Sequence, residues 1–400
     1  MPRLSDAGVV LLVACMVHLL HDGIADALYL LLPLWSQEFG LTLFQIGALR
    51  AAFSSGMALF QIPAGFLAER HGESRVLLWG TVVTGAGVIA ATGATDFDGL
   101  IVFLVLAGLG SGVQHPLGSA LVSTAFEHAR RRAALGTYNF AGDLGKVSVP
   151  SVLALAVVWW GWRTPFAAAG AAAVAMVLVM GVFRPWRRWD TAAATSESTK
   201  GWGIRNTRAF SALGGVGLID YTTRTACLTF LPFVLRGKGA GLPAIGGALA
   251  LVFAGGATGK FLCGLLAERI GIVRTVVATE IATALGMAAV VVSPLGVAMG
   301  ALFPLGIALN GTSSVLYATV ADLVFAHRRS RAYGLYYTVM LGAAALAPAA
   351  YGALGDRIGV PAVLLVASAC ALLTIPLVFV MQQAMRERPD RVGPALAEEV

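Results

Sequence analysis

The segment GFLAERHGESR, residues 65–75, decides the fold of this chain because the chain contains it twice. The second copy, GLLAERIGIVR at 264–274, follows the first by 199 residues (264 − 65). Another pair of similar segments, 125–138 and 324–337, has the same offset of 199 residues (324 − 125). Two motifs at one offset indicate a tandem duplication, so each half of the chain is expected to fold into the same unit.

The composition predicts that both halves lie in a membrane. Of the 400 residues, 58% are hydrophobic and 12% are charged, and the mean hydropathy is +0.79. Soluble domains carry about 25% charged residues. A membrane-spanning helix needs about 20 mainly apolar residues. Twelve segments meet this requirement: 7–34, 44–68, 76–95, 99–124, 133–158, 163–183, 209–235, 243–267, 274–293, 296–321, 332–354 and 359–384.

Lysine and arginine are distributed unevenly between these segments. Twenty of the 28 lie in one set of loops and in the two termini, four lie in the other set, and four lie inside spans. Because cytoplasmic loops carry the excess of basic residues, both termini are expected on the cytoplasmic side of a bacterial inner membrane. The net charge of +7 follows from this bias, and no nucleic-acid partner is inferred.

The twelve spans divide into two sets of six. We expect an N-terminal six-helix bundle (1–184), a cytoplasmic linker (185–207), and a C-terminal six-helix bundle with a short tail (208–400). Because six is even, the two halves have the same orientation. Parallel repeats of this kind are typical of transporters whose binding site lies near the membrane midplane between the halves. The predicted fold is all-α and integral to the membrane, with twelve helices in two parallel repeats.

The repeated loop segment resembles the cytoplasmic loop signature of the major facilitator superfamily, G-x-L-A-[DE]-R-x-G-x-x-R. The resemblance implies alternating access by rocking of the two halves, with the loop carboxylates and arginines holding one closed state. Glutamate stands where the family usually has aspartate, which lengthens the acidic arm. Basic loops and tight glycine turns alone explain the arginines but not the repeated acid. The matching residues are Gly65, Leu67, Glu69, Arg70, Gly72 and Arg75, and Gly264, Leu266, Glu268, Arg269, Gly271 and Arg274.

Three segments carry a narrower resemblance. GLGSGVQHPLGSALVS at 108–123, HLLHD at 18–22 and TYNFAGDLGKVSVP at 137–150 are similar to segments of the fosmidomycin resistance-type exporters. Those exporters often have an acidic residue after His-Pro, where this chain has Leu117. The identity of the solute does not follow from this resemblance.

Within the first span, the segment 16–33 is apolar apart from His18, His21, Asp22 and Asp26. Residues three and four apart share a helix face, so the first three are expected on one side of the helix, with Asp26 at its margin. Ionisable groups inside a span are costly and usually functional, and histidine exchanges protons near neutral pH. The sequence therefore predicts a proton-binding or solute-binding cluster, with Asp22 as the first candidate, although a static packing network is the alternative.

Two further candidates lie in the second and fourth spans. Arg50 is expected to contact an anionic solute or to extend its head group toward the interface, and Gln61 shares its helix face. In the fourth span, His115 is expected to bind solute or a proton, or to be a packed neutral histidine.

The fifth span brings together Asn139, Asp143 and Lys146. Asp143 and Lys146 are expected to form an ion pair that either opens when solute replaces one partner or only neutralises the two charges. In the seventh span, Asp220 and Arg224 stand four apart and are expected to form an ion pair. The offset of 199 relates Asp220 to His21 and Lys260 of the eighth span to Gln61, so both halves are polar at matching positions. The tenth span adds Asn310.

The chain has no Walker loop and no catalytic or metal-binding pattern, and its four cysteines lie in apolar stretches without a CxxC pair. We therefore expect no enzyme activity, no metal and no cofactor, with the proton gradient as energy source and a monomer in the lipid bilayer as the working form.

The sequence predicts a secondary transporter that exports a small polar or anionic organic solute or drug in exchange for protons. Two alternatives use the same residues: a proton-coupled uptake symporter for a metabolite, and a membrane receptor or scaffold that has lost transport. A membrane enzyme is a further alternative, but the chain lacks a nucleophile with a base.

Overall fold

The computed structural model describes residues 6–126, 128–182, 202–325 and 329–387. These residues are almost entirely helical, and their one β feature is an isolated bridge between Ile204 and Val324. The first half contains α1 (Asp6–Phe39), α2 (Leu43–His71), α3 (Glu73–Ala91), α4 (Phe97–Ser111), α5 (Gln114–Ala125), α6 (His128–Trp160) and α7 (Arg163–Val182). The second contains α8 (Thr207–Gly237), α9 (Leu242–Ile270), α10 (Ile272–Val292), α11 (Leu295–Val320), η2 (Ala321–Leu323), α12 (Arg329–Ile358), α13 (Val360–Ala371) and α14 (Thr374–Arg386).

The predicted count of twelve spans is confirmed. Ten spans in the described part of the chain are long and apolar enough to cross a membrane. The other two are α7, whose apolar part is shorter, and α8, which has 31 residues. Most of the predicted linker (185–207), namely residues 185–201, lies outside the described residues.

Two of the spans are broken near their middle. The fourth consists of α4 and α5, and the twelfth of α13 and α14. The first break lies at Gly112 and Val113, where α2 comes so close that a Cβ on Gly112 would overlap the Met57 carbonyl. The break lies between Ser111 of α4 and His115 of α5, so it falls inside the part of the span that contacts α1.

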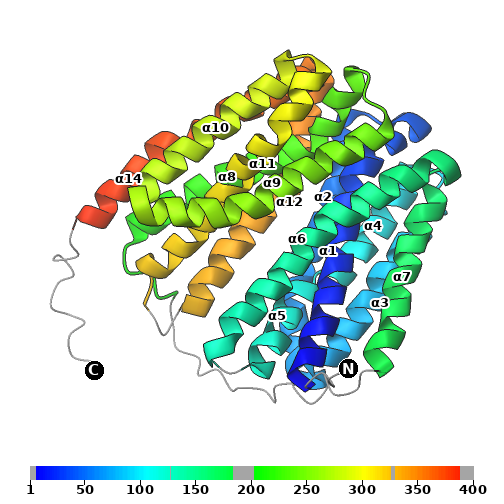
Figure 1. Ribbon diagram of the computed structural model, residues 1–400, viewed down its shortest axis with the longest axis horizontal. Helices are drawn as coiled ribbons and strands as arrows, with labels where there is room; N and C mark the ends of the chain where they lie inside the picture. The colour runs from blue at the N-terminus through cyan, green and yellow to red at the C-terminus, as the bar shows by residue number, and fades with distance from the viewer. Residues whose placement is uncertain (1–5, 127, 183–201, 326–328, 388–400) are drawn as a thin grey trace.

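The two halves form bundles that lie side by side (Figure 1). Their interface is made mainly by α2 against α12 and by α6 against α9. The repeat offset of 199 residues relates α2 to α9 and α6 to α12, so the two crossings are symmetry-related copies of each other. This is the arrangement expected of parallel repeats around a shared axis.

The halves are tightly packed at one end, which we call the closed face: residues 36–47, 150–154, 236–246 and 348–356. A Cβ on Gly47 of α2 would overlap the backbone of Pro348 in α12, and a Cβ on its repeat partner Gly246 would overlap Ala154. The carboxylate of Asp356 accepts hydrogen bonds from the backbone N–H groups of Leu43 (2.7 Å) and Phe44 (3.0 Å). Glycine is required at both crossings because the helices leave no room for a side chain.

Gln37 and Arg236 also join the halves at the closed face. The guanidinium of Arg236 donates to the side-chain carbonyl of Gln37. These residues are 199 positions apart, which is the repeat offset. Equivalent residues meet only near the axis that relates the repeats, so this contact marks where the axis leaves the molecule.

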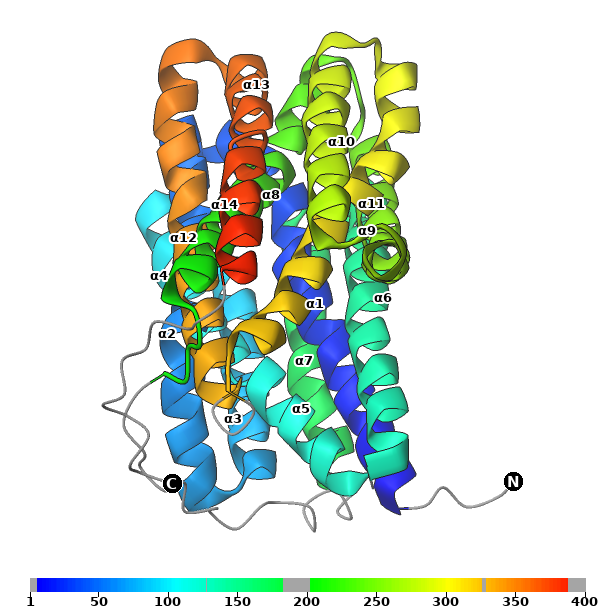
Figure 2. The same ribbon diagram turned by 90° about the vertical axis from the view of Figure 1, so that its left-hand side faces the viewer.

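The opposite end, which we call the motif face, carries the two copies of the loop signature. Its turns are made by Gly72 and Gly271, whose φ angles of 87° and 88° favour glycine. Glu69 and Glu268 are exposed and form no ion pair with another described residue. The ends of the two bundles diverge at this face (Figure 1, with a second view in Figure 2). The predicted role of these loops in holding a closed state stays a prediction.

Candidate functional site

A cavity of about 200 Å³ lies between the halves, midway along the helices. Its walls come from α1, α2, α5 and α6 of the first half and from α8, α9, α11 and α12 of the second. Polar and charged groups are unusually dense for the interior of a membrane protein. They are Asp22, Asp26, Tyr29, Arg50, Ser54, His115, Asp143, Lys146, Tyr221, Arg224, Thr225, Lys260 and Asn310.

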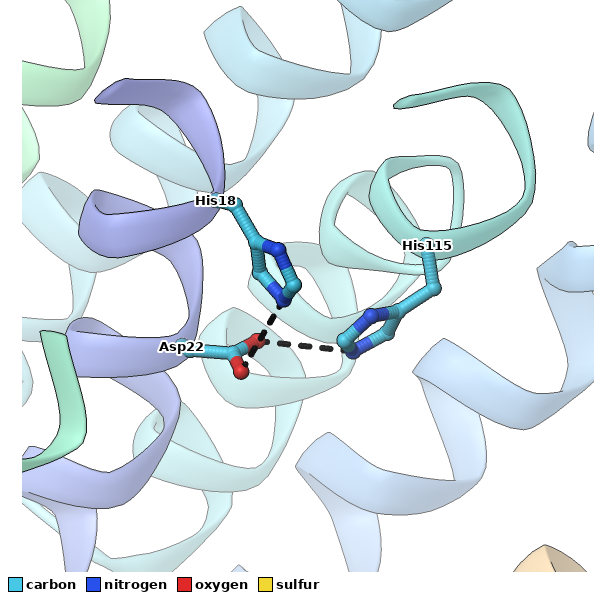
Figure 3. Close-up of side chains that lie close together, drawn as sticks. All are labelled: His18, Asp22 and His115. Carbon is cyan, nitrogen blue, oxygen red and sulfur yellow. Dashed lines mark ion pairs between the residues drawn. The ribbon is translucent and has the colours of Figure 1, made fainter. Parts of the chain in front are cut away.

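Asp22 is the centre of a buried cluster at one side of the cavity. Its carboxylate lies 3.2 Å from Nε2 of His18, one helical turn earlier in α1, and 3.4 Å from Nε2 of His115 in α5. Figure 3 shows both imidazoles directed at this carboxylate from two helices. The ring of His18 is supported from behind by Tyr138, with ring centroids 4.2 Å apart. Two imidazoles around one buried carboxylate can accept, share and release a proton.

The same three side chains offer ligand atoms that a metal ion could use, all within 4.8 Å of one another. However, the ammonium group of Lys146 lies 3.2 Å from the Asp22 carboxylate. A divalent cation would have to displace this positive charge from its own carboxylate ligand. The arrangement therefore fits a proton better than a metal ion.

Ion pairs continue from Asp22 across the interface between the halves. Lys146 lies 3.6 Å from Asp143 on the same helix, and Asp143 accepts hydrogen bonds of 2.6 and 2.9 Å from Lys260 of α9. The predicted couple of Asp143 and Lys146 is thus part of a longer chain. This chain runs from the histidines through two acids and two lysines, and its last link connects the two bundles.

Two arginines face the cavity with unused hydrogen-bonding capacity. Arg50 donates to the Ala25 carbonyl (3.1 Å) and stacks on Tyr29, but its nearest carboxylate oxygen, on Asp26, is 4.0 Å away. Its Nε group is buried and has no hydrogen-bond partner. Arg224 stacks on Tyr221 at 4.1 Å and forms no ion pair with a described residue. These guanidinium groups suit an added anion.

The cavity wall carries more positive than negative groups. Four cationic side chains face three carboxylates, before any proton on His115 is counted. A site with an excess positive charge inside the membrane is stabilised by an anionic occupant.

His21 does not share the cavity face predicted for it. Its imidazole points into the first bundle, where Nε2 lies 3.1 Å from the hydroxyl of Thr81 and Nδ1 lies 3.3 Å from that of Ser111. His18 and Asp22 turn toward α5 and α6, and His21 turns toward α3 and α4. The predicted face was too broad to separate these two directions.

The predicted ion pair between Asp220 and Arg224 is wrong. Arg224 turns to Tyr221 and the cavity, whereas Asp220 points into the second bundle and contacts Glu280 of α10. Glu280 was not predicted, although a glutamate inside the apolar segment 274–293 was a visible signal. Tyr221 was not predicted either. Tyr29 was expected on the polar face of the first span, but the stacking of Tyr29 and Tyr221 on the two arginines was not.

The remaining predicted residues are divided between the cavity and its surroundings. Asn310 lines the cavity and donates to the Gly306 carbonyl (3.3 Å). Gln61 and Asn139 lie outside the cavity wall. Asn139 is exposed.

Comparison with known proteins agrees with this architecture. The family model described as Major Facilitator Superfamily matches residues 14–212 and again 213–399, one match for each repeat. The fold is also that of a bacterial homologue of the human lysosomal transporter Spinster, solved in an inward-facing, unoccupied conformation. That structure has a TM-score of 0.81 at 16% identity and covers 96% of this chain and 98% of the other.

Curated relatives handle several solutes. A probable sulfoacetate transporter of Cupriavidus necator is 27% identical over 67% of this chain and 66% of its own length. A 4-hydroxybenzoate transporter of Acinetobacter baylyi is 29% identical over 43% and 38%, respectively. The fosmidomycin resistance protein of Escherichia coli is 28% identical over 36% and 35%. The matches thus span less than two thirds of these relatives. With a family model matched over both repeats, the chain belongs to the major facilitator superfamily.

Proposed function

We propose that the protein moves a small organic anion across the bacterial inner membrane in a proton-coupled cycle, as a monomer with both termini in the cytoplasm. The observation that carries the proposal is the central cavity, where two guanidinium groups lie beside the Asp22 proton cluster. Arg50 is only loosely paired with Asp26, at 4.0 Å, and has an unpartnered Nε group, and Arg224 forms no ion pair with a described residue. In this orientation the motif face is cytoplasmic, and the closed face seals the cavity from the outside.

The anionic nature of the solute is supported by the charges of the cavity. Each arginine comes from a different half, so an anion held between them would contact both bundles. Sulfoacetate, 4-hydroxybenzoate and L-galactonate, which appear in the names of relatives, are all carboxylates at neutral pH. A carboxylate or sulfonate group matches the two-pronged geometry of a guanidinium group.

The ion-pair chain favours movement of the anion together with a proton. A proton on Asp22 would neutralise the carboxylate that now holds Lys146 at 3.2 Å. Lys146 would then be free to bind the anion or to take over Asp143 from Lys260. Protonation therefore strengthens anion binding, which is the linkage that a symporter needs. With a proton gradient directed into the cell, such a cycle accumulates the anion.

Export in exchange for protons is the second candidate function. It is favoured by the similarity to the fosmidomycin resistance protein and to a multidrug resistance protein of Mycobacterium tuberculosis, which is 34% identical over 29% of this chain. In an exchanger the solute and the proton would compete for the same groups around Asp22.

The experiment that tests the proposal uses proteoliposomes with a pH-sensitive dye in the lumen and sulfoacetate added outside. Symport acidifies the lumen, exchange makes it more alkaline, and protein-free liposomes give the background. We expect acidification with the wild type, and a loss of at least about tenfold with Asp22→Asn, because asparagine cannot take up and release a proton.

The matched control is Asp98→Asn, an exposed acid at the start of α4, which should keep the wild-type signal. Sulfoacetate counterflow without any pH change in the wild type would show that transport is not coupled to protons. Alkalinisation, or movement of fosmidomycin but of none of the three carboxylates, would favour the exporter.

A further inference from the structure

A second pair of ionisable groups lies inside the second bundle, away from the cavity. Asp220 of α8 and Glu280 of α10 are 3% and 1% exposed, and neither lines the cavity. Their carboxyl groups are in hydrogen-bond contact with each other. Two carboxylates at this separation in a buried site do not both ionise, because like charges repel and burial disfavours charge. The contact therefore requires a proton between them.

The hydroxyl groups around Glu280 lead to the same conclusion. Thr312 of α11 contacts Glu280 and donates its hydroxyl proton to Thr279 (2.7 Å). Thr279 in turn donates to the Thr275 carbonyl (3.0 Å). A threonine hydroxyl has one proton. With that proton directed at Thr279, Thr312 accepts a hydrogen bond from Glu280, which agrees with a protonated Glu280.

Several buried polar atoms in this network have no hydrogen-bond partner. Oδ2 of Asp220, Oε1 of Glu280 and the hydroxyls of Thr223 and Thr283 are buried without a hydrogen-bond partner. Each threonine stands three residues after one of the acids, on the same helix face, and is 1% or 3% exposed. Buried polar groups are rarely left unpaired. The pair is therefore not a completed structural network, and it has room for a further proton.

One charged group connects this pair to the cavity. Arg224 follows Asp220 by one helical turn, acts on it electrostatically, and lines the cavity wall. The buried residues of α11, α13 and α14 include no charged side chain. Titratable groups on helices that pack against α8 or α10 include Tyr336 of α12, Asp26 and Tyr29 of α1, and Lys260 and Cys263 of α9.

The repeat shows that the fold does not itself require two acids here. The offset of 199 relates Asp220 to His21 and Glu280 to Thr81, and these partners also meet, at 3.1 Å. The same two positions face each other in both bundles. In the first bundle these positions hold an imidazole, which can be neutral, and a hydroxyl group. In the second bundle they hold two carboxyl groups.

We propose that Asp220 and Glu280 form a second proton-binding site, which shares one proton when the cavity is empty and takes up another when an anion binds Arg224. The anion draws the positive charge of Arg224 away from its interaction with Asp220, and the carboxylate is then easier to protonate. The shared proton is independent of the proposed function, but its coupling to the cavity rests on anion binding there.

Infrared spectroscopy of the purified full-length protein tests the shared proton. A protonated carboxyl group has its own carbonyl-stretch band, which shifts in heavy water. We expect such a band at neutral pH, with a component lost in Glu280→Gln and in Asp220→Asn, shifted in Thr312→Val, and unchanged in Asp98→Asn. Thr312→Val keeps both acids, so it still tests the proposal if Glu280→Gln and Asp220→Asn do not fold. An unchanged band in all three variants overturns the proposal. The proposal is also overturned if the band disappears when choline chloride is replaced by sodium chloride, because the pair would then bind a sodium ion in place of the proton.

A pH-indicator titration in detergent tests the coupling. Protons taken up per sulfoacetate bound are counted for the wild type, Glu280→Gln and Asp98→Asn. We expect Glu280→Gln to lower the count by up to one proton and Asp98→Asn to leave it unchanged. An equal count in Glu280→Gln overturns the coupling. If sulfoacetate does not bind the wild type, the proposed anion specificity fails, while the infrared band still decides whether the pair holds a proton.

Discussion

Arginine and lysine have different positions in this cavity. Both lysines are held by carboxylates, Lys146 by Asp22 and Asp143, and Lys260 by Asp143. Arg50 and Arg224 are instead stacked on tyrosines at 4.4 and 4.1 Å. A ring face fixes the guanidinium plane without using its N–H donors. The lysines are thus suited to switching between acids, and the arginines to holding a planar anion.

Substituting lysine for either arginine should weaken anion binding while keeping the charge. Arg50→Lys and Arg224→Lys each remove one or more charge-assisted hydrogen bonds, worth about 1.5–3 kcal/mol, which corresponds to roughly a 10- to 100-fold loss of affinity. Calorimetric titration of the purified variants with 4-hydroxybenzoate measures this. Arg208→Lys, in an exposed pair with Glu387, is the control. Equal affinity in all three variants would contradict the arginine site.

The positions of single residues were the part of the site that the sequence predicted least well. Asp22, Arg50, His115, Asp143, Lys146, Arg224, Lys260 and Asn310 all line the cavity. The partners of Asp220 and His21 could not be derived, because helical periodicity indicates a face but not the helix that packs against it. Here α3 and α10 provide those partners.

At the scale of the helices, α6 depends on glycine to bring the proton cluster together. A Cβ on Gly142 would overlap the His18 ring, and one on Gly145 would overlap the Leu19 backbone. Glycine along a span lets neighbouring helices approach closely. The close approach of α6 to α1 is therefore what places Lys146 within reach of Asp22.

Gly142→Ala should impair proton coupling without unfolding the protein. The added methyl group displaces His18, a side chain that can move, from its position 3.2 Å from Asp22. We expect at least about a tenfold slower sulfoacetate-driven pH change, since a displacement of about 1 Å at a reacting group can cost 100-fold. Gly136→Ala on the same helix has no neighbour within 4 Å and should match the wild type. If both variants slow transport equally, helix propensity and not His18 is the cause.

The number and order of the spans were predictable from the sequence because apolar length and loop charge are local properties. The breaks in the fourth and twelfth spans were not, since they depend on contacts such as that between Gly112 and Met57. Ser111 and His115 lie on either side of the fourth-span break and have different partners, His21 and Asp22.

At the scale of the whole molecule, the two symmetry-related crossings close one face while the motif face stays open. The exposed loop residues Glu69 and Glu268 lack ion-pair partners among the described residues, as expected for the open side of an alternating-access cycle. Such a cycle requires the contacts at Gly47 and Gly246 to separate.

A large side chain at a crossing should keep the closed face from sealing. Gly246→Leu would collide with Ala154, whereas Gly247 on the same helix has no neighbour within 4 Å. With the four native cysteines replaced, a cysteine at Thr225 in the cavity reports access to a membrane-impermeant thiol reagent from the closed face. We expect faster labelling and slower transport in Gly246→Leu and unchanged values in Gly247→Leu. Identical labelling in both would show that this crossing does not control access.

The Asp143–Lys260 bridge also shows how far the two halves have become complementary. The repeat offset places Gln61 and Gly342 at the matching positions of the other crossing, so this ion pair exists on one side only. A dimer of two first halves would place each Asp143 opposite Gln61, without the lysine that the second half provides across the crossing. A dimer of two second halves would hold two unpaired lysines and set Arg236 against Arg236. The ancestral copies have thus diverged into two parts that need each other, and neither half of the gene can replace its partner.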